Sequence, residues 1–343
     1  MSEECQLTIK DIARLSGYSV ATVSRALNSH PDISEEAREK IMAVVAQQDF
    51  QPNNNAKHLK QHADAGVAII VKGIMNLLFA ELVERLQDLL QSAGQETAVY
   101  YLDEDANEVA YACQLCRERK PRGILFLGGD LKQFRAGFAP ITVPCVLLTN
   151  SARELDFPNL SSFTTDDAAA AAQVIELLAA QGHRRIGVLG GNDSCFQIGF
   201  RRLMGCQTAF QKLDIPFDEA RQFAPCRYSM RDGYDATRRL LERCPDLTAI
   251  FAVSDVMAVG AIRALQDLGK RVPEDISIVG YDGIETSRYT VPRLTTVRQD
   301  VSRLAERGVD DLLRRIGWNR PPVHEVIPFQ LSPGESVARP GHD

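Results

Sequence analysis

The sequence predicts a small all-α domain at the N-terminus, followed by an α/β core of two doubly wound lobes with parallel sheets. Residues 1–50 contain three short segments with apolar residues at helical spacing. From Gly66 onward, short apolar runs bounded by Gly, Asn or Asp alternate with segments of helical period, as in parallel sheets covered on both faces. This second region spans about 280 residues, which is too long for one sheet and predicts two lobes.

The first two helices are expected to flank a tight turn. The segment TIKDIARLSG, residues 8–17, places Thr8 as the N-cap of the first helix and Gly17 at its end. The segment SVATVSRALN, residues 19–28, begins a second helix with Ser19 as its cap.

A third helix is expected in SEEAREKIMAVVAQQ. Ser34 is its predicted N-cap, and Glu35 and Glu36 lie at the positive end of the helix dipole. Ile41 belongs to its apolar stripe. Three helices of this size, with a tight turn between the first two, predict a helix-turn-helix domain over residues 1–50.

Seven apolar runs predict strands of the core, and their order alternates with helical segments. The runs are GVAIIV, ETAVYYL, GILFLGG, CVLLTN, RIGVLGG, AIFAVSD and ISIVGYD. In doubly wound sheets the functional loops follow the carboxyl ends of the strands, so binding residues are expected just after these runs.

Composition and charge exclude several classes of protein. The 39 Lys and Arg against 45 Asp and Glu give a net charge of −6, which provides no general attraction to nucleic acid or to an anionic membrane. No apolar run approaches the roughly 18 residues of a membrane span. The N-terminus MSEECQLTIK has neither a positive n-region nor an apolar h-region, so we expect no secretory signal and a cytoplasmic location.

The eight cysteines are scattered along the chain and predict free thiols. Cys113 and Cys116 form a C-x-x-C inside a helical segment, but no second pair or histidine stands at ligand spacing. We therefore expect no metal, no cofactor and a reducing compartment.

Two motifs together resemble the LacI/GalR family of bacterial transcriptional repressors. TIKDIARLSGYSVATVSRALN is similar to the family's helix-turn-helix almost residue for residue, and DISIVGYDGIE…PRLTTVRQD is similar to its second signature, more than 200 residues downstream. The resemblance runs nearly end to end. It implies a DNA-binding domain, a hinge helix or linker, and an effector-binding and dimerisation core like the periplasmic sugar-binding proteins. The implied boundaries are residues 1–50 for the DNA-binding domain, 51–64 for the hinge and 65–343 for the core. Within the core, the N-lobe is expected over about 65–164 and 299–321, and the C-lobe over about 165–298 and 322–343.

The resemblance implies that the second helix reads DNA in the major groove. Val20, Ala21 and Arg25 occupy the positions that face base edges, where Arg25 can contact guanine with two hydrogen bonds and the small side chains can contact a thymine methyl. The alternative is that Val20 and Val23 are both core and Arg25 is solvated; Val23 and Leu27 are expected in the core. Phosphate contacts are implied for Thr8, Thr22, Ser24 and Asn28.

Residues 1–63 are not basic, with seven Lys and Arg against eight Asp and Glu. DNA affinity is therefore expected to depend on dimeric geometry more than on bulk charge, with a modest salt dependence.

The segment QPNNNAKHLKQHADAG is the implied hinge. Pro52 stops the third helix, and the three asparagines that follow favour no helix on their own. The resemblance implies a short helix over residues 53–60 that forms when two copies pair on DNA, because an isolated helix of this length is unstable. Leu59 matches the leucine that wedges into the minor groove, and Ala56 the small residue at the helix pair. The alternative is a flexible polar linker.

The resemblance also implies an effector cleft between the lobes. It places Phe79, Thr149, Arg202, Tyr228, Ser254, Asp282 and Gln299 in that cleft. Thr149 and Ser254 depart from the Asp and Asn common in the family, which weakens the case for a familiar hexose. The alternatives are that Phe79 is core, that Arg202 is a surface residue, and that Asp282 caps a turn. A carbohydrate or related metabolite is expected on family grounds.

The sequence thus predicts a dimeric, ligand-responsive repressor acting on a near-palindromic operator. An effector that releases DNA and one that promotes binding are both compatible with it, as is activation in place of repression. The alternative is a solute-binding protein of a sugar transporter, which the helix-turn-helix disfavours. No enzyme is expected, because no G-x-G-x-x-G follows the first strand and no G-x-S-x-G or H-E-x-x-H occurs.

Overall fold

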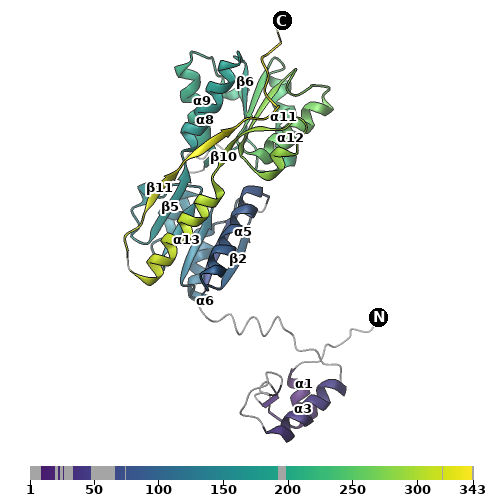
Figure 1. Ribbon diagram of the computed structural model, residues 1–343, viewed down its shortest axis with the longest axis vertical. Helices are drawn as coiled ribbons and strands as arrows, with labels where there is room; N and C mark the ends of the chain where they lie inside the picture. The colour runs from purple at the N-terminus through teal and green to yellow at the C-terminus, as the bar shows by residue number, and fades with distance from the viewer. Residues whose placement is uncertain are drawn as a thin grey trace. The chain divides into compact units, whose positions relative to one another are not determined.

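The computed structural model describes residues 9–19, 22–23, 26, 34–47, 66–73, 75–191, 198–318 and 320–341. The chain divides into two compact units, Met1–Asp64 and Ala65–Asp343 (Figure 1).

The N-terminal unit contains the predicted helices α1 (Ile9–Ser16) and α3 (Glu35–Gln47). Gly17 ends α1 with a φ of +76°, and its N–H donates to the carbonyl of Ala13 at 3.1 Å. The apolar side chains of all three predicted helices contribute to one small core, made of Ala13, Val23, Ala26 and Ile41.

Two serines cap helices as predicted. The backbone N–H of Thr22 donates to Ser19 Oγ at 3.1 Å, and that of Ala37 donates to Ser34 Oγ at 3.4 Å. These bonds satisfy donors at the first turn that have no partner inside the helix. Ser19 therefore marks the start of the second helical segment.

The N-lobe of the large unit has a six-stranded sheet in which all strands are parallel. Its order is β11-β5-β4-β3-β1-β2. The strands are β1 (Val67–Lys72), β2 (Thr97–Leu102), β3 (Gly123–Leu127), β4 (Cys145–Leu148), β5 (Leu160–Thr165) and β11 (His324–Ile327). Its helices are α5 (Leu77–Ser92), α6 (Glu108–Glu118), α7 (Leu131–Gly137) and α13 (Val301–Gly317), with a short 3-10 turn η1 (Arg153–Leu155). Helix α13 packs beside α5 and over the sheet (Figure 1).

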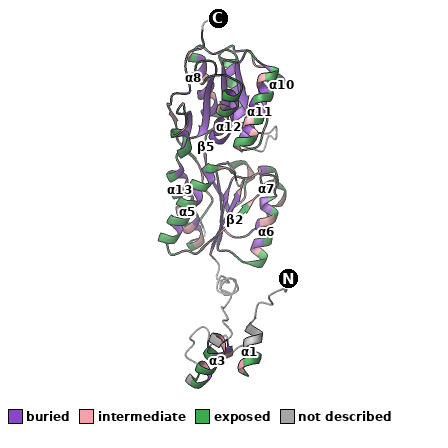
Figure 2. Cartoon of the chain, turned by 90° about the vertical axis from the view of Figure 1, so that its right-hand side faces the viewer, coloured by how far each residue is buried: buried purple, intermediate pink, exposed green. Residues whose placement is uncertain are grey.

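The C-lobe has a second six-stranded sheet, in which β12 alone runs antiparallel. Its order is β12-β10-β9-β8-β6-β7. The strands are β6 (Ile186–Leu189), β7 (Phe223–Ala224), β8 (Ala249–Ala252), β9 (Ser277–Asp282), β10 (Thr295–Gln299) and β12 (Phe329–Ser332). Its helices are α8 (Asp167–Ala180), α9 (Ile198–Lys212), α10 (Glu219–Gln222), α11 (Met230–Arg243) and α12 (Asp255–Asp267), with a 3-10 turn η2 (Glu285–Arg288). In both lobes the central strands are buried between helical layers, while the edge strands β2, β11 and β12 are partly exposed (Figure 2).

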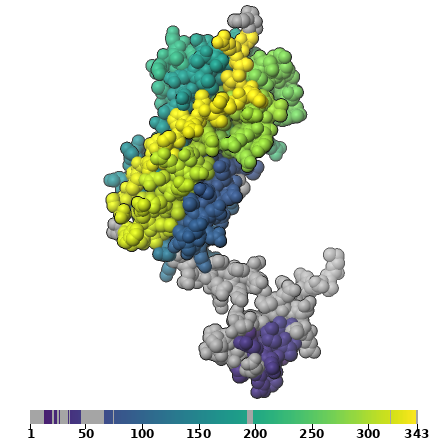
Figure 3. Space-filling model, viewed as in Figure 1, coloured from purple at the N-terminus to yellow at the C-terminus, as the bar shows by residue number. Residues whose placement is uncertain are grey.

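The chain crosses between the lobes three times, after β5, after β10 and between β11 and β12. The C-terminal segment consequently runs along both lobes (Figure 3). The prediction that the C-lobe resumes at residue 322 is wrong, because His324–Ile327 forms β11 and pairs with β5 of the N-lobe. The last crossing is at Pro328. One continuous extended segment forms β11 in the N-lobe sheet before this residue and β12 in the C-lobe sheet after it.

All seven apolar runs form strands, as predicted: β1, β2, β3, β4, β6, β8 and β9. The predicted fold of a helix-turn-helix domain with two parallel-sheet lobes is confirmed. No helix within the described residues is both long and apolar enough to span a bilayer.

Candidate functional site between the two lobes

A cleft opens between the lobes at the carboxyl ends of their strands. From the N-lobe it is lined by the segments that follow β1, β2, β3 and β4, and from the C-lobe by Ile198 and Tyr228. Three of the predicted effector residues, Phe79, Thr149 and Tyr228, line this cleft together. Phe79 is nevertheless only 7% exposed, so it is both a core residue and part of the wall.

Two predicted site residues have strained backbones. Thr149 follows β4 with a φ of +69°, and Asp282 ends β9 with a φ of +112°. Positive φ is unfavourable for residues with a Cβ, and such strain is concentrated at functional sites. Each lobe therefore holds one strained polar residue at a strand end beside the cleft.

The N-lobe wall carries an ion pair that the sequence analysis missed. Lys72 Nζ lies 2.7 Å from Glu108 Oε2, and the Glu108 side chain is fully buried. The other oxygen of Glu108 accepts from the backbone N–H of Asp130 at 2.6 Å. The lysine charge at the end of β1 is thus matched by a carboxylate at the start of α6.

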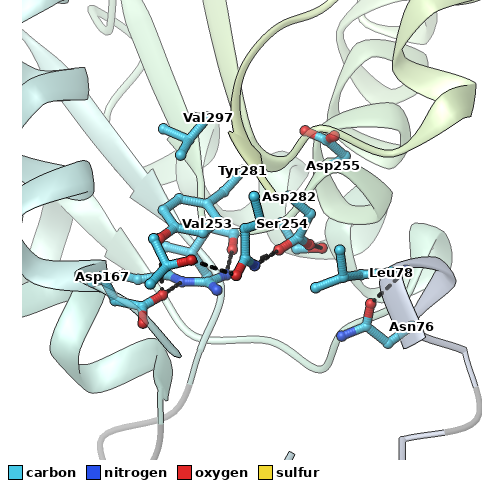
Figure 4. Close-up of polar contacts among 12 residues, drawn as sticks. Asn76, Leu78, Asp167, Val253, Ser254, Asp255, Tyr281, Asp282 and Val297 are labelled. Atoms are coloured by element: carbon cyan, nitrogen blue, oxygen red, sulfur yellow. Dashed lines mark hydrogen bonds and ion pairs between the residues drawn. The ribbon is translucent and has the colours of Figure 1, made fainter. Parts of the chain in front are cut away.

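Two asparagines on the same wall hold the local backbone. Asn76 Oδ1 accepts from the Leu78 N–H at 3.1 Å and caps α5, as Figure 4 shows. Asn150 Nδ2 donates to the carbonyl of Gly129 at 3.1 Å. Lys72 follows the run GVAIIV, and Asn150 ends the run CVLLTN. Both could have been predicted, because binding residues in doubly wound sheets follow the carboxyl ends of the strands.

Arg202 lies behind the cleft and joins three elements of the C-lobe. Its Nε donates to Asp167 Oδ1 at 2.8 Å, and its Nη1 donates to the carbonyl of Val253 and lies 3.6 Å from Asp282 Oδ1. The guanidinium also stacks over the ring of Tyr281, with Cζ 3.6 Å from the ring centroid. The alternative that Arg202 is a surface residue is wrong, because only 3% of it is exposed.

Asp282 is the centre of the second half of this network (Figure 4). Its carboxylate accepts from Ser254 Oγ at 2.8 Å and from Gln299 Nε2 at 2.9 Å. Gln299 Oε1 accepts in turn from Thr165 Oγ1 at 2.9 Å. Because Thr165 ends β5 and Gln299 ends β10, the network reaches both of these inter-lobe crossings. Burial raises the pKa of Asp282 to about 6, although the Arg202 charge and these hydrogen bonds oppose the shift.

The turn after β9 is held by a different carboxylate. Asp255 Oδ2 accepts from the N–H groups of Gly283 and Ile284 at 2.8 and 2.9 Å, and its Oδ1 accepts from Thr296 Oγ1. Burial raises the pKa of Asp255 well above its usual value. The alternative in which Asp282 caps this turn therefore does not hold.

The four predicted residues Arg202, Ser254, Asp282 and Gln299 are thus brought together, but as a buried network behind the cleft lining. Sequence reasoning missed Asp167, which supplies a carboxylate to Arg202 from the first turn of α8. Tyr281 OH donates to the same Asp167 oxygen at 2.9 Å. Burial raises the pKa of Asp167, and Arg202 opposes that rise.

An exposed rim cluster connects the lobes at the cleft mouth; it consists of Asp103, Glu104, Asp105 and Arg227. Arg227 Nη2 lies 2.7 Å from Asp103 Oδ1 and 3.2 Å from Asp105 Oδ2. Its Nε lies 3.6 Å from Glu104 Oε2, an oxygen that also accepts from the Tyr228 N–H at 3.4 Å. Glu104 belongs both to this cluster and to the cleft wall.

The Tyr228 hydroxyl is buried and has no hydrogen-bond partner among the described residues. Burial raises the pKa of this phenol. A buried hydroxyl without a partner is costly, so it is a group that a bound ligand can satisfy.

Most of the predicted DNA contacts cannot be placed. Thr22 is described, and its hydroxyl lies 2.8 Å from Ser19 Oγ at the start of the second helical segment. The other predicted contacts lie outside the described residues: Thr8, Val20, Ala21, Ser24, Arg25, Asn28, Ala56 and Leu59.

The described cysteines are all free thiols, including Cys113 and Cys116 on α6. Burial raises the pKa of both. No group of three or more His, Cys, Asp or Glu side chains with metal-binding geometry occurs in the described part of the chain.

Two family descriptions match the chain. "Bacterial regulatory proteins, lacI family" matches residues 8–53, and "Periplasmic binding protein-like domain" matches residues 158–337. The chain is 33% identical over 329 residues to the HTH-type transcriptional regulator MalR of Clostridium butyricum, covering 95% of this chain and 97% of that one.

Two solved structures are similar over nearly the whole chain. A transcriptional regulator CelR–cellobiose complex has a TM-score of 0.69 and 26% identity, covering 96% of this chain and 99% of the other. The lac repressor dimer bound to operator and the anti-inducer ONPF also has a TM-score of 0.69, with 25% identity and coverage of 97% and 99%.

Proposed function

Since the chain belongs to the LacI family of bacterial regulatory proteins, we propose that it is a dimeric repressor whose affinity for a near-palindromic DNA operator is controlled by a small carbohydrate in the inter-lobe cleft. Such a protein acts in the cytoplasm, where operator DNA is found. The observation that carries the proposal is the cleft itself, which takes its walls from both lobes of a chain that also has the family's DNA-binding segment.

In the proposed DNA complex, the second helix enters the major groove. Val20, Ala21 and Arg25 face base edges, and Thr8, Thr22, Ser24 and Asn28 contact phosphates. The Ser19 cap fixes where this helix begins and therefore which side chains come first into the groove. Ala56 and Leu59 act in the minor groove at the operator centre.

The cleft has the features that a sugar requires. Phe79 and Tyr228 offer apolar and aromatic surface for ring faces, while asparagine, threonine and carboxylate groups offer hydrogen bonds to hydroxyls. The buried network around Arg202 and Asp282 gives this wall a fixed geometry, because each side chain in it is held by others. The solved structure of CelR, a structural relative, is that of its complex with cellobiose.

The switch follows from a ligand that contacts both lobes. Such a ligand favours one relative position of the lobes over the other, and it shifts the equilibrium by its difference in affinity for the two states. If the N-lobes of a dimer then move apart, the hinge segments, which directly precede the core, are separated. If the N-lobes move together, the two hinge segments are brought into contact.

The proposal is tested by selecting binding sites from a random duplex library with purified protein, with and without a pool of sugars. We expect a palindrome of roughly 14–20 base pairs, set by two half-sites and a flexible central step. Arg25→Ala is expected to relax one guanine in each half-site, and Leu59→Ala to weaken binding and relax the centre. Failure to enrich a site under either condition would contradict the repressor assignment.

A further inference from the structure

The charges around the cleft define which sugars it accepts. We propose that the cleft takes a polyhydroxyl ligand without negative charge and excludes phosphorylated and carboxylated sugars, and that Glu104 sets this selectivity. The inference rests on the proposed function, because it assumes that the cleft is the effector site.

Glu104 presents a carboxylate to the cleft. It follows β2, lines the cavity, and its side chain is 25% exposed. One oxygen, Oε2, accepts from the Tyr228 N–H and faces Arg227 at 3.6 Å. The other oxygen has no hydrogen-bond partner among the described residues. Burial raises the pKa of Glu104, and the Tyr228 N–H and Arg227 only partly oppose this. The group is thus an incompletely satisfied acceptor suited to ligand hydroxyls.

The cations near the cleft are already neutralised by the protein. Lys72 is paired with the buried Glu108 at 2.7 Å. Arg202 lies between Asp167 and Asp282, at 2.8 and 3.6 Å. Neither side chain is therefore available to balance the charge of an anionic ligand.

Arg227 is likewise surrounded by the three carboxylates of the rim cluster. Among the residues that the structure describes, the wall, the network behind it and the rim contain three cations (Lys72, Arg202 and Arg227) and seven carboxylates. The carboxylates are Asp103, Glu104, Asp105, Glu108, Asp130, Asp167 and Asp282.

An anionic sugar would therefore enter a site of its own charge sign. Like charges brought together in a partly desolvated site cost several kcal/mol, which corresponds to a loss of about 100-fold or more in affinity. An uncharged sugar avoids this cost, and its hydroxyls can donate to Glu104 and Asp130, the two carboxylates that line the cleft. The unpartnered Tyr228 hydroxyl supplies a further polar contact opposite Glu104's wall.

The inference is tested by calorimetric titration of the full-length protein with matched sugars. The probes are glucose, galactose and mannose, each with its uronate, its 6-phosphate and its 2-amino derivative, together with cellobiose and maltose. We expect the uronate and the phosphate to bind about 100-fold more weakly than the uncharged sugar of the same ring, whereas the 2-amino derivative meets no such repulsion. An acidic derivative that binds as tightly as its uncharged parent would overturn the inference while leaving the repressor function intact. Absence of binding across the panel, with operator binding retained, would instead contradict the carbohydrate effector itself.

The role of Glu104 is isolated by Glu104→Gln, which keeps the size of the side chain and removes its charge. We expect the discrimination against the acidic derivative to fall by about tenfold, with a smaller change for the uncharged sugar. Glu242→Gln makes the same charge change at an exposed position of α11 and is expected to leave the discrimination unchanged. Operator affinity without sugar checks that both variants fold. Equal discrimination in wild type and Glu104→Gln would show that Glu104 does not set the selectivity.

Discussion

Arg202 Nε lies 2.8 Å from Asp167 Oδ1, and both side chains are almost completely buried. The pair joins the first turn of α9 to the first turn of α8, and Asp282 on β9 faces the same guanidinium. Three charged groups thus depend on one another in a buried site. Removal of Arg202 would leave two buried carboxylates without a counter-charge, whereas removal of either carboxylate would leave the other one paired with Arg202.

Arg202→Met is therefore expected to reduce the free energy of unfolding by about 3–5 kcal/mol, because Asp167 and Asp282 lose their buried partner. Urea denaturation measures this loss. Lys212→Ala, which breaks an exposed pair with Glu176, is the control and is expected to cost less than about 1 kcal/mol. Equal effects of the two changes would mean that the buried pair gives no special stabilisation.

The stability of the C-lobe is expected to depend on the ionisation of Asp282. Burial raises its pKa from 3.8 to about 6, so the folded chain holds this proton more tightly than the unfolded chain. The contribution to stability is therefore complete below about pH 4 and is lost as the pH rises through about 6.

Asp282→Asn removes this titration, so wild type should gain stability relative to the variant as the pH falls from 7 to 5. Urea denaturation of both proteins at the two pH values gives the comparison. Other carboxylates titrate in both proteins and cancel. Parallel pH profiles would indicate that Asp282 is not the group that titrates.

Arg227→Ala is expected to loosen the cleft mouth with little effect on global stability. Each of its ion pairs is exposed and screened by solvent, so each contributes little to global stability. Amide hydrogen exchange is expected to accelerate in residues 103–106 and 225–229. Arg263→Ala, which breaks an exposed pair with Asp267 inside α12, should leave exchange in these segments unchanged. An unchanged rim in Arg227→Ala would mean that the cluster does not hold the lobes.

Ser19→Ala is expected to weaken the start of the second helical segment. Loss of an N-cap costs about 1 kcal/mol, so amide exchange at Thr22, Val23 and Ala26 should accelerate about fivefold. Ser19→Asp keeps an acceptor at the cap and should retain the wild-type exchange rates. Fast exchange in both variants would assign the role to the hydroxyl donor instead.

Apolar runs predicted seven strands, because a parallel strand covered on both faces needs apolar side chains at nearly every position. Strand β5 was not predicted by this rule. Its sequence LSSFTT is fully buried, but three of its four hydroxyls are satisfied by distant groups: Ser161 by Arg315, Ser162 by His324, and Thr165 by Gln299. Those partners lie more than 130 residues away, so no local pattern reports them.

The candidate site was predictable to a similar degree. Motif positions identified Phe79, Thr149 and Tyr228, which do line the cleft. They also identified Arg202, but not that Asp167 binds it, since a buried ion pair depends on how two helices pack. Glu104 was not predicted, because the acidic sequence of residues 103–105 after a strand is typical of a solvated turn. Only the approach of the C-lobe makes the carboxylate of Glu104 part of the cleft wall.

The path of the chain between the lobes has a consequence for shortened forms of the protein. β11 is the outermost strand of one sheet and β12 the outermost strand of the other, and they are separated by Pro328 alone. A premature stop codon before residue 324 would remove both, leaving the unpaired N–H and C=O groups of β5 and β10 exposed at once. Such edges pair readily with other polypeptides. A short truncation would therefore produce a chain that aggregates through these edges, in place of a folded protein that has merely lost its tail.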